Sequence, residues 1–209
     1  MILTNIFENP IETINLNSSS EKELILEHLK DLDRESKELR FCGNVSDYSI
    51  EKYVESLEKK RDFTYGIFDD SFVNPFGKSY LIAFGHLAKL QKEDEFELAL
   101  SVSPLYREKG LGKKLLEDLL FVRAKNLKAK SIHCECLYVN KKIQSLFEKK
   151  GVELDKSSKD YVQGRIYLDG QGDINSHLQE NYANILELQK RITRTGREFL
   201  TVSLFNKLN

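Results

Sequence analysis

The stretch Val102–Leu120, "VSPLYREKGLGKKLLEDLL", constrains the fold of this 209-residue chain more than any other. It begins at the end of a strand-like run, "EFELALSV", and passes through an arginine and two closely spaced glycines. The chain continues with a predicted apolar stripe at helical spacing, formed by Leu115, Leu116, Leu119 and Val122. A second strand-like run, "KSIHCECLYV", comes next. Strand, helix and strand in this order predict one parallel, right-handed βαβ unit.

The patterns on either side of this unit predict further helices and antiparallel strands. "SSSEKELILEHLKDL", with a capping box at Ser20 and Glu23, and "SDYSIEKYVESLEKK" have helical periodicity. The segment "DRESKEL" between them is expected to be a short charged turn. The runs "FTYGIF" and "SYLIAFGHLAKL" are strand-like. After the βαβ unit, the sequence predicts the helix "NKKIQSLFEKKG" and the antiparallel pair "GVELD" and "YVQGRIYLD". The predicted fold class is α+β, with a mixed, mostly antiparallel sheet and one βαβ crossover.

The pattern changes after this core. Residues 1–170 are predicted to form one domain, and residues 171–209 a C-terminal amphipathic helical extension. Its apolar residues recur every three or four positions: Ile174, Leu178, Tyr182, Ile185, Leu188 and Ile192. Such a stripe must be buried, either against the domain or against a second copy, which leaves a monomer and a homodimer open.

Composition narrows the choice of partners and compartment. A net charge of -1 provides no basic field for nucleic acid, and no apolar run approaches the ~20 residues that span a membrane. The odd, sparse cysteines Cys42, Cys134 and Cys136 do not make a disulfide framework and fit a reducing, cytoplasmic location. Cys134 and Cys136 share one strand face while His133 lies on the other, which favours packing over a metal site.

The glycine turn has the chemistry of an anion site. A helix N-terminus presents unpaired backbone N–H groups and a partial positive charge. Gly110 and Gly112 remove side chains where a phosphate must approach the backbone. Arg107, Lys109 and Lys113 add positive charge, and the fork of Arg107 suits phosphate oxygens. A diphosphate is the expected ligand, although a turn that only reverses the chain would carry the same glycines.

Two well-known phosphate motifs match this turn poorly. A P-loop needs four residues between its first glycine and Gly-Lys-Ser/Thr, whereas one residue separates Gly110 from Gly112, and Lys114 stands at the hydroxyl position. The dinucleotide fingerprint needs a third glycine where Leu115 stands. Glu135 lies roughly where that fold has its ribose-binding acid, so a nicotinamide-dependent oxidoreductase stays open as an alternative.

A third motif matches better. The turn resembles the pyrophosphate motif of the GCN5-related N-acetyltransferases (GNAT), Arg/Gln-x-x-Gly-x-Gly/Ala, with Arg107, Gly110 and Gly112 at its defining positions. "FELALSV" is similar to the family's central strand, and "CLYVNKKIQSLFEKKGVEL" to its next strand and Asn-initiated helix. The resemblance extends roughly from Ile14 to Leu168 and implies the GNAT acyl-CoA N-acyltransferase-like fold.

The resemblance implies acetyl-coenzyme A (acetyl-CoA) as co-substrate. Its pantetheine arm would pair with the backbone from Leu100 to Val102, and the Val102 amide would polarise the thioester carbonyl. Asn140 would contact the pantetheine, a role compatible with capping its helix. The pyrophosphate would lie beside Arg107, on the backbone amides of Glu108, Lys109, Gly110, Leu111, Gly112 and Lys113.

Acetyl transfer also needs a base and an acid. An alkylamine of pKa ~10.4 is mostly protonated near neutrality, and a carboxylate can take its proton directly or through water. Glu97 is the first candidate and Glu95 the second. Both are possible because strand alternation puts them on one face. In the family a tyrosine of the Asn-initiated helix protonates the leaving thiolate. Here Phe147 holds that position and is expected to contact the cofactor. Either Tyr138, Tyr106 or water replaces the tyrosine, or the thiolate leaves unassisted.

Two functions follow from the resemblance. The first is an N-acetyltransferase that transfers the acetyl group directly to a primary amine of a protein lysine, a protein N-terminus or a small molecule. The second, favoured by Phe147, is a catalytically weak acetyl-CoA-binding regulatory module. The acceptor itself stays open. Selectivity in this fold comes largely from the early helices and loops, here about Ser20–Lys60 and Asp69–Lys78.

Overall fold

The computed structural model describes residues 14–16, 21–73, 79–92 and 94–168. They form a seven-stranded sheet in the order β1-β2-β3-β4-β5-β7-β6. The strands are β1 (Ile14–Asn15), β2 (Asp62–Val73), β3 (Ser79–Lys89), β4 (Glu95–Val102), β5 (Ser131–Leu137), β6 (Glu153–Asp155) and β7 (Tyr161–Tyr167). The helices are α1 (Glu21–Lys30), α2 (Arg34–Phe41), α3 (Asp47–Ser56), α4 (Leu111–Asp118), α5 (Ala124–Asn126) and α6 (Lys141–Glu148).

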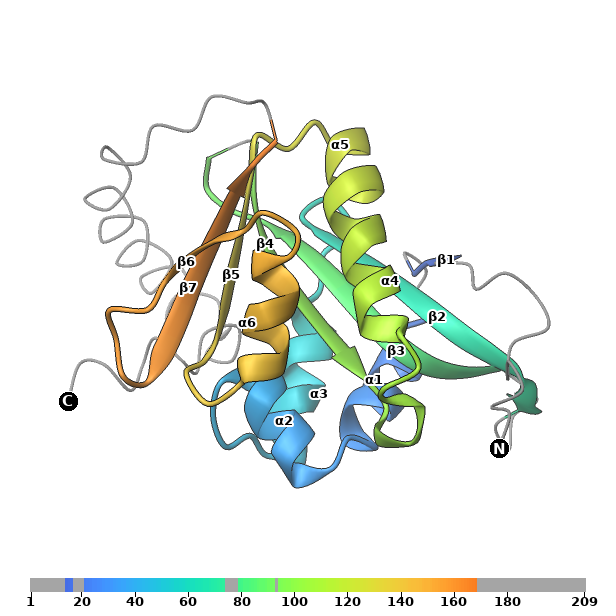
Figure 1. The fold of residues 1–209 in the computed structure, drawn as a ribbon. Coiled ribbons are helices and arrows are strands. Elements are labelled where there is room, and N and C mark those ends of the chain that lie inside the picture. The colour runs from blue at the N-terminus through green and yellow to red at the C-terminus, as the bar shows by residue number, and fades with distance from the viewer. Residues whose placement is uncertain (1–13, 17–20, 74–78, 93, 169–209) are drawn as a thin grey trace, which may run out of the picture.

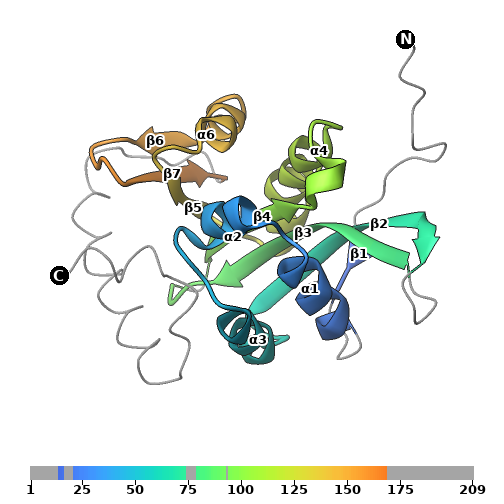
Figure 2. The ribbon, with the colours of Figure 1, turned by 90° about the horizontal axis from the view of Figure 1, so that it is seen from below.

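The sheet confirms the predicted fold class. Neighbouring strands run antiparallel except β4 and β5, which are parallel and are joined by the crossover through α4 and α5. Helices α4 and α6 lie on one face of the sheet, while α1 and α3 lie on the other (Figures 1 and 2). Helix α2 lies near the ends of β4 and β5 (Figure 2).

Each face of the sheet has its own hydrophobic core. On the α4 side, Leu115, Leu116 and Leu119 pack over residues of the central strands such as Phe96. The core on the α1 and α3 side gathers Ile25, Leu29, Ile50, Tyr53 and Phe84. Cys134 and Cys136 are buried, as expected of packing residues. Because helices cover both faces, the central strands can carry the functional residues in a desolvated setting.

Helix α2 corrects the prediction of a charged turn at "DRESKEL". Asp33 is its N-cap, and a carboxylate oxygen accepts a hydrogen bond from the Ser36 amide at 2.7 Å. At the other end, Cys42 adopts the left-handed conformation with φ 54°. The helix is short and mostly polar, so its apolar periodicity was too weak to read. The cap at Asp33 was the local signal that could have revealed it.

A π-helical turn at Leu119–Arg123 changes the predicted apolar stripe of the crossover helix. Leu115, Leu116 and Leu119 are buried as expected, but Val122 is 46% exposed. The wider turn shifts the side chains that follow it around the helix axis. The stripe prediction is therefore wrong for Val122.

Some predictions lie beyond the described residues. The helical extension after Asp173 and the cap at Ser20 are among them, so the two-part division at residue 170 stays a prediction. No helix of the described ranges is both long and apolar enough to cross a membrane.

Candidate active site

Strands β4 and β5 are paired only over their first residues. Their parallel register joins Glu95 to Ser131, Phe96 to Ile132, and Glu97 to His133. Further along, β4 remains paired with β3 up to Val102, and β5 remains paired with β7 up to Leu137. The two strands therefore separate in the middle of the sheet, and the edge of β4 beyond Glu97 faces a gap.

The backbone of β4 is directed into this gap at alternate residues. In an antiparallel pair, successive residues turn their N–H and C=O groups to opposite sides. The Ser103 amide donates to the Ile82 carbonyl at 2.9 Å, so Ser103 faces β3. Leu100 and Val102 are out of phase with Ser103 by an odd number of residues and face β5. Their backbone groups can bind an extended ligand, as the resemblance implied.

A cleft of about 180 Å³ lies at this gap. The predicted cofactor residues in its wall are Leu100, Val102, Arg107, Asn140 and Phe147. The wall also includes residues for which no role was predicted, among them Ser36, Leu39, Arg40 and Ser101, as well as Glu135, which had been considered only as a ribose-binding acid. The cleft thus joins α2, β4, β5, α6 and the turn before α4.

The turn before α4 has the backbone of an anion site. Gly110 adopts φ 82° and is the N-cap of α4, with no side-chain capping bond. Glu108 also has a positive φ, 62°. An added Cβ on Gly110 would meet no atom within 4 Å, so the requirement for glycine there is conformational. The first amides of α4 lack a side-chain cap and are available to phosphate oxygens.

The charged side chains of this turn have partners on neighbouring elements. Arg107 Nη2 donates to both carboxylate oxygens of Asp33, at 3.2 and 3.1 Å. The Lys142 ammonium lies 3.0 Å from Glu108, and Lys109 lies over the ring of Tyr106. Hydrogen bonds from Ser36, and then from Arg107, hold the pKa of Asp33 below its usual value. These contacts are at least partly exposed, so a ligand can replace them at small cost.

Glu97 lies deep in the protein beside the gap, and is only partly exposed. Desolvation, and then the negative charge of Glu135, raises the pKa of Glu97 to about 7, while Arg40 opposes this shift. Among the described residues, no hydrogen bond or ion pair to the Glu97 carboxyl is present. A carboxyl group without a partner and with a pKa near neutrality has the properties of a general base.

Arg40 and Glu135 complete this group, and their meeting was not predicted from the sequence. Both line the cleft, Arg40 from α2 and Glu135 from β5. Glu135 Oε2 accepts a hydrogen bond from Gln163 at 2.9 Å, whereas Glu135 Oε1 is buried without a partner. The same is true of Arg40 Nε. We call Arg40, Glu97 and Glu135 the charged pocket.

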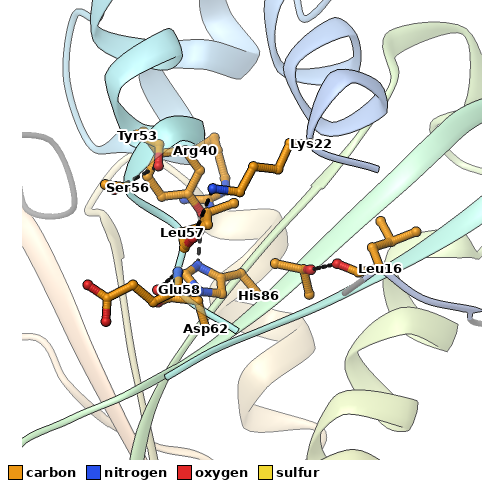
Figure 3. A network of polar contacts seen from close by, with 10 residues as sticks. Leu16, Lys22, Arg40, Tyr53, Ser56, Leu57, Glu58, Asp62 and His86 are labelled. Atoms are coloured by element: carbon orange, nitrogen blue, oxygen red, sulfur yellow. Dashed lines mark hydrogen bonds and ion pairs between the residues drawn. The ribbon is translucent and has the colours of Figure 1, made fainter. Parts of the chain in front are cut away.

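A buried chain of hydrogen bonds holds Arg40 (Figure 3). Arg40 Nη2 donates to the Tyr53 hydroxyl at 3.1 Å. Tyr53 contacts His86 Nδ1 at 2.8 Å, and His86 Nε2 lies 3.1 Å from the Asp62 carboxylate. With the His86 ring neutral, Nε2 donates to Asp62 and Nδ1 accepts from Tyr53. Every donor therefore points the same way, from the arginine toward Asp62, and the guanidinium is fixed in the cleft wall.

A second histidine orients a cleft residue. His28 Nε2 lies 2.8 Å from the hydroxyl of Ser101, and its Nδ1 lies 2.9 Å from the Leu81 carbonyl. The carbonyl can only accept, so Nδ1 donates to it and Nε2 accepts from Ser101. Burial lowers the pKa of His28 to about 4, which keeps the ring neutral. Ser101 is thus held against α1.

Of the other predicted residues, Asn140 and Phe147 line the cleft, while Tyr138 and Glu95 lie outside its lining. Asn140 caps α6, its side chain accepting from the Ile143 amide at 3.3 Å, which confirms the N-cap. Phe147 is buried in the cleft wall. Tyr138 is outside the cleft lining, with the Lys141 ammonium over its ring. Glu95 is outside it too, at the start of β4, where it pairs with His133 at 3.3 Å.

Comparison with known proteins shows to which protein family this chain belongs. A family model described as "Acetyltransferase (GNAT) family" matches residues 26–152, more than half of the chain. The chain therefore belongs to the GNAT family, and family and fold together make it an N-acetyltransferase. Members of this family use acetyl-CoA as the acetyl donor. The comparison with curated proteins gave no match.

Solved structures share the fold at low sequence identity. The GNAT domain of S. lividans PAT is 17% identical, with a TM-score of 0.59, over 76% of this chain and 90% of that domain. Spermidine N-acetyltransferase from Vibrio cholerae, in complex with CoA and spermine, is 15% identical, with a TM-score of 0.60, over 76% and 96%. Ribosomal-protein-S5-alanine acetyltransferase from Vibrio fischeri is 13% identical, with a TM-score of 0.59, over 80% and 98%. At these identities the likeness shows the fold alone.

Proposed function

We propose that this chain is a cytoplasmic enzyme that transfers the acetyl group of acetyl-CoA directly to a primary amine, with Glu97 as the general base. The observation that carries the proposal is the position of an unpartnered carboxyl, with a pKa of about 7, beside the gap between β4 and β5. Three free, buried cysteines support the reducing compartment.

The residues present fit acetyl-CoA. The uncapped amides of α4 and the Arg107 guanidinium suit a pyrophosphate, and the outward backbone of Leu100 and Val102 suits the amides of a pantetheine arm. A Cβ on Gly112 would lie 3.6 Å from Val102, so the turn leaves room near the cleft. When bound, acetyl-CoA supplies an acetyl group activated as a thioester.

Three residues carry out acetyl transfer in this scheme: Val102, Glu135 and Glu97. The N–H of Val102 stabilises negative charge that develops on the acetyl oxygen. Glu135, in the cleft wall, attracts the ammonium form of the acceptor. Glu97 then takes a proton from that ammonium through water, because Glu97 is not itself in the lining. Its pKa of about 7 means that a large share of Glu97 is ionised and ready at neutral pH.

Among the described residues, no tyrosine lines the cleft wall to protonate the departing thiolate. Phe147 has no proton to give, Tyr138 lies outside the lining, and the Tyr106 hydroxyl donates to Asp69 at 2.7 Å. A thiol of pKa ~8.5 leaves without strong assistance. We therefore assign this protonation to water.

The proposal is tested by thiol release from acetyl-CoA with a panel of small amines, lysine peptides and N-terminal peptides, together with calorimetry of CoA binding. We expect turnover with at least one acceptor. Arg107→Ala should weaken CoA binding by roughly 10- to 100-fold, as loss of a charged hydrogen bond implies. Arg34→Ala, an exposed arginine on α2, is the control and should bind CoA normally.

The results separate the enzyme from the regulatory module that Phe147 favours. Tight CoA binding without thiol release from any acceptor would identify a binding module. Undiminished binding by Arg107→Ala would mean that the phosphate site has been assigned to the wrong residues. Labelled protein and ping-pong kinetics would overturn direct transfer.

A further inference from the structure

We propose that the acceptor is a small zwitterionic amine, an amino acid or a close relative, with its carboxylate on Arg40 and its ammonium on Glu135. The inference rests on the proposed function and names its substrate class. It starts from the two residues of the charged pocket that line the cleft, Arg40 from α2 and Glu135 from β5.

The first observation is a pair of unsatisfied atoms. Among the described residues, the buried side-chain nitrogen and oxygen atoms without a hydrogen-bond partner are Arg40 Nε and Glu135 Oε1. Native structures rarely leave such atoms unpaired, and each instance needs a reason. One atom is a donor on a cation and the other an acceptor on an anion, and both side chains line one cleft.

The two groups do not satisfy each other. No ion pair between Arg40 and Glu135 is present in the described part of the chain. By contrast, Arg107 in the same cleft already has Asp33 as its partner. A ligand with a carboxylate at one end and an ammonium at the other would complement both charges, whereas a simple amine would complement only Glu135.

Several contacts fix the position of the Arg40 guanidinium. The buried hydrogen bonds through Tyr53, His86 and Asp62 anchor its Nη2 atom. The guanidinium also lies 5.1 Å from the ring of Phe41 and 5.6 Å from that of Tyr53. Only one of its N–H donors has a partner among the described residues. A planar guanidinium with donors to spare matches the geometry of a carboxylate.

The charge of Arg40 favours an acceptor that carries a free carboxylate near its amine. A peptide N-terminus has a neutral amide where an amino acid has its carboxylate, so it would leave the charge of Arg40 unmatched.

The test compares matched acceptors on the full chain with acetyl-CoA. Thiol release is measured for α- and ω-amino acids, for their amides, and for the decarboxylated amines, with spermidine included. We expect the best amino acid to exceed its amide in kcat/KM by at least about tenfold, as a charged hydrogen bond implies. Arg40→Gln should reduce this acid-to-amide ratio by at least about tenfold.

The ratio isolates carboxylate recognition. Loss of Arg40 also changes the surroundings of Glu97, but that effect acts on both acceptors and cancels. Arg34→Gln, on the same helix with its side chain 84% exposed, should leave the ratio unchanged. If Arg40→Gln does not fold, Arg40→Lys keeps the charge without the fork and should give a smaller drop in the ratio.

Two outcomes would overturn the inference while the proposed function stands: amides or polyamines that exceed the amino acids, or an Arg40→Gln variant with an unchanged ratio. If no amine releases thiol, the proposed function fails, and the inference is then judged by calorimetry of amino acids against the CoA-bound protein. Binding that is lost in Arg40→Gln supports it, and the absence of binding overturns it.

Discussion

The turn before α4 and the charged pocket both contribute residues to one cleft, and they satisfy their charges in opposite ways. In the turn, Arg107 pairs with Asp33 and Glu108 with Lys142, in contacts that are open to solvent. In the pocket, Arg40 and Glu135 have buried atoms without partners, and the pKa of Glu97 is raised to about 7. Solvated pairs exchange partners at little cost, but deep unpaired charges do not. Loss of an existing contact between side chains should therefore cost more in the pocket than in the turn.

The largest expected effect is that of Glu97→Gln. Loss of a general base typically lowers kcat by roughly 100- to 10,000-fold. Since Glu97 acts when ionised, wild-type kcat/KM should rise with pH through about 7, and the variant should lack this inflection. Steady-state rates from pH 5.5 to 9 provide the measurement. Glu95→Gln is the control, because the Glu95 carboxylate is already paired with His133 at the start of β4. An inflection that persists in Glu97→Gln would move the base to another residue.

The next effect concerns stability in acid. The pKa of His28 in the folded chain is about 4, below the 6.5 of an unperturbed histidine, because the ring is buried. The unfolded chain therefore binds more protons between these values, so stability is intact above pH 6.5 and is lost as pH falls toward 4. The loss approaches about 3 kcal/mol. Urea denaturation at several pH values measures it, and His28→Gln should flatten this acid limb. An unchanged limb would remove His28 as its source.

A smaller effect is expected from Tyr53→Phe. The substitution removes the hydroxyl that joins Arg40 to His86 and leaves buried polar atoms unpaired. It should lower the free energy of unfolding by about 1 to 3 kcal/mol, which denaturation with urea can measure. Tyr48→Phe on the same helix, where the tyrosine is 64% exposed, should change little. Equal stability of the two variants would show that the buried chain of hydrogen bonds does not support the pocket.

The smallest effect is expected in the turn. Asp33→Asn keeps a good N-cap for α2 but removes the carboxylate that competes with phosphate for Arg107. An exposed pair of this kind contributes about 0.2 to 1 kcal/mol, so CoA should bind up to about fivefold more tightly. Calorimetry measures the change. Glu38→Gln is the control, because Glu38 is the partner of the exposed Arg34. Weaker binding would mean that Asp33 positions Arg107 instead of competing for it.

The contrast between turn and pocket also separates what could be predicted from what could not. Arg107, Gly110 and Gly112 lie within six consecutive positions of the sequence. The left-handed φ of Gly110 and the cap at Asn140 depend on neighbours a few residues away, so local pattern was enough. The strand order around the crossover was predictable for a related reason, because right-handed connection of parallel strands leaves few alternatives.

The pocket resisted prediction because its members come from distant parts of the chain. Glu97 was predicted as a base from the resemblance, but Arg40 directly follows a segment predicted to be a turn, and Glu135 was considered only as a ribose-binding acid. Helix α2 brings Arg40 to β5, and the separation of β4 from β5 exposes Glu135 to the same cleft. No spacing rule connects residues 40 and 135.

The amino-acid sequence by itself determined the strands, the crossover helix and the phosphate turn, because these depend on backbone preferences and short-range periodicity. The tertiary structure alone decided that Arg40, Glu97 and Glu135 share one desolvated neighbourhood, and that the pKa of Glu97 rises. Desolvation and charge–charge interaction depend on distance in space and on burial, and neither can be read from separation along the chain.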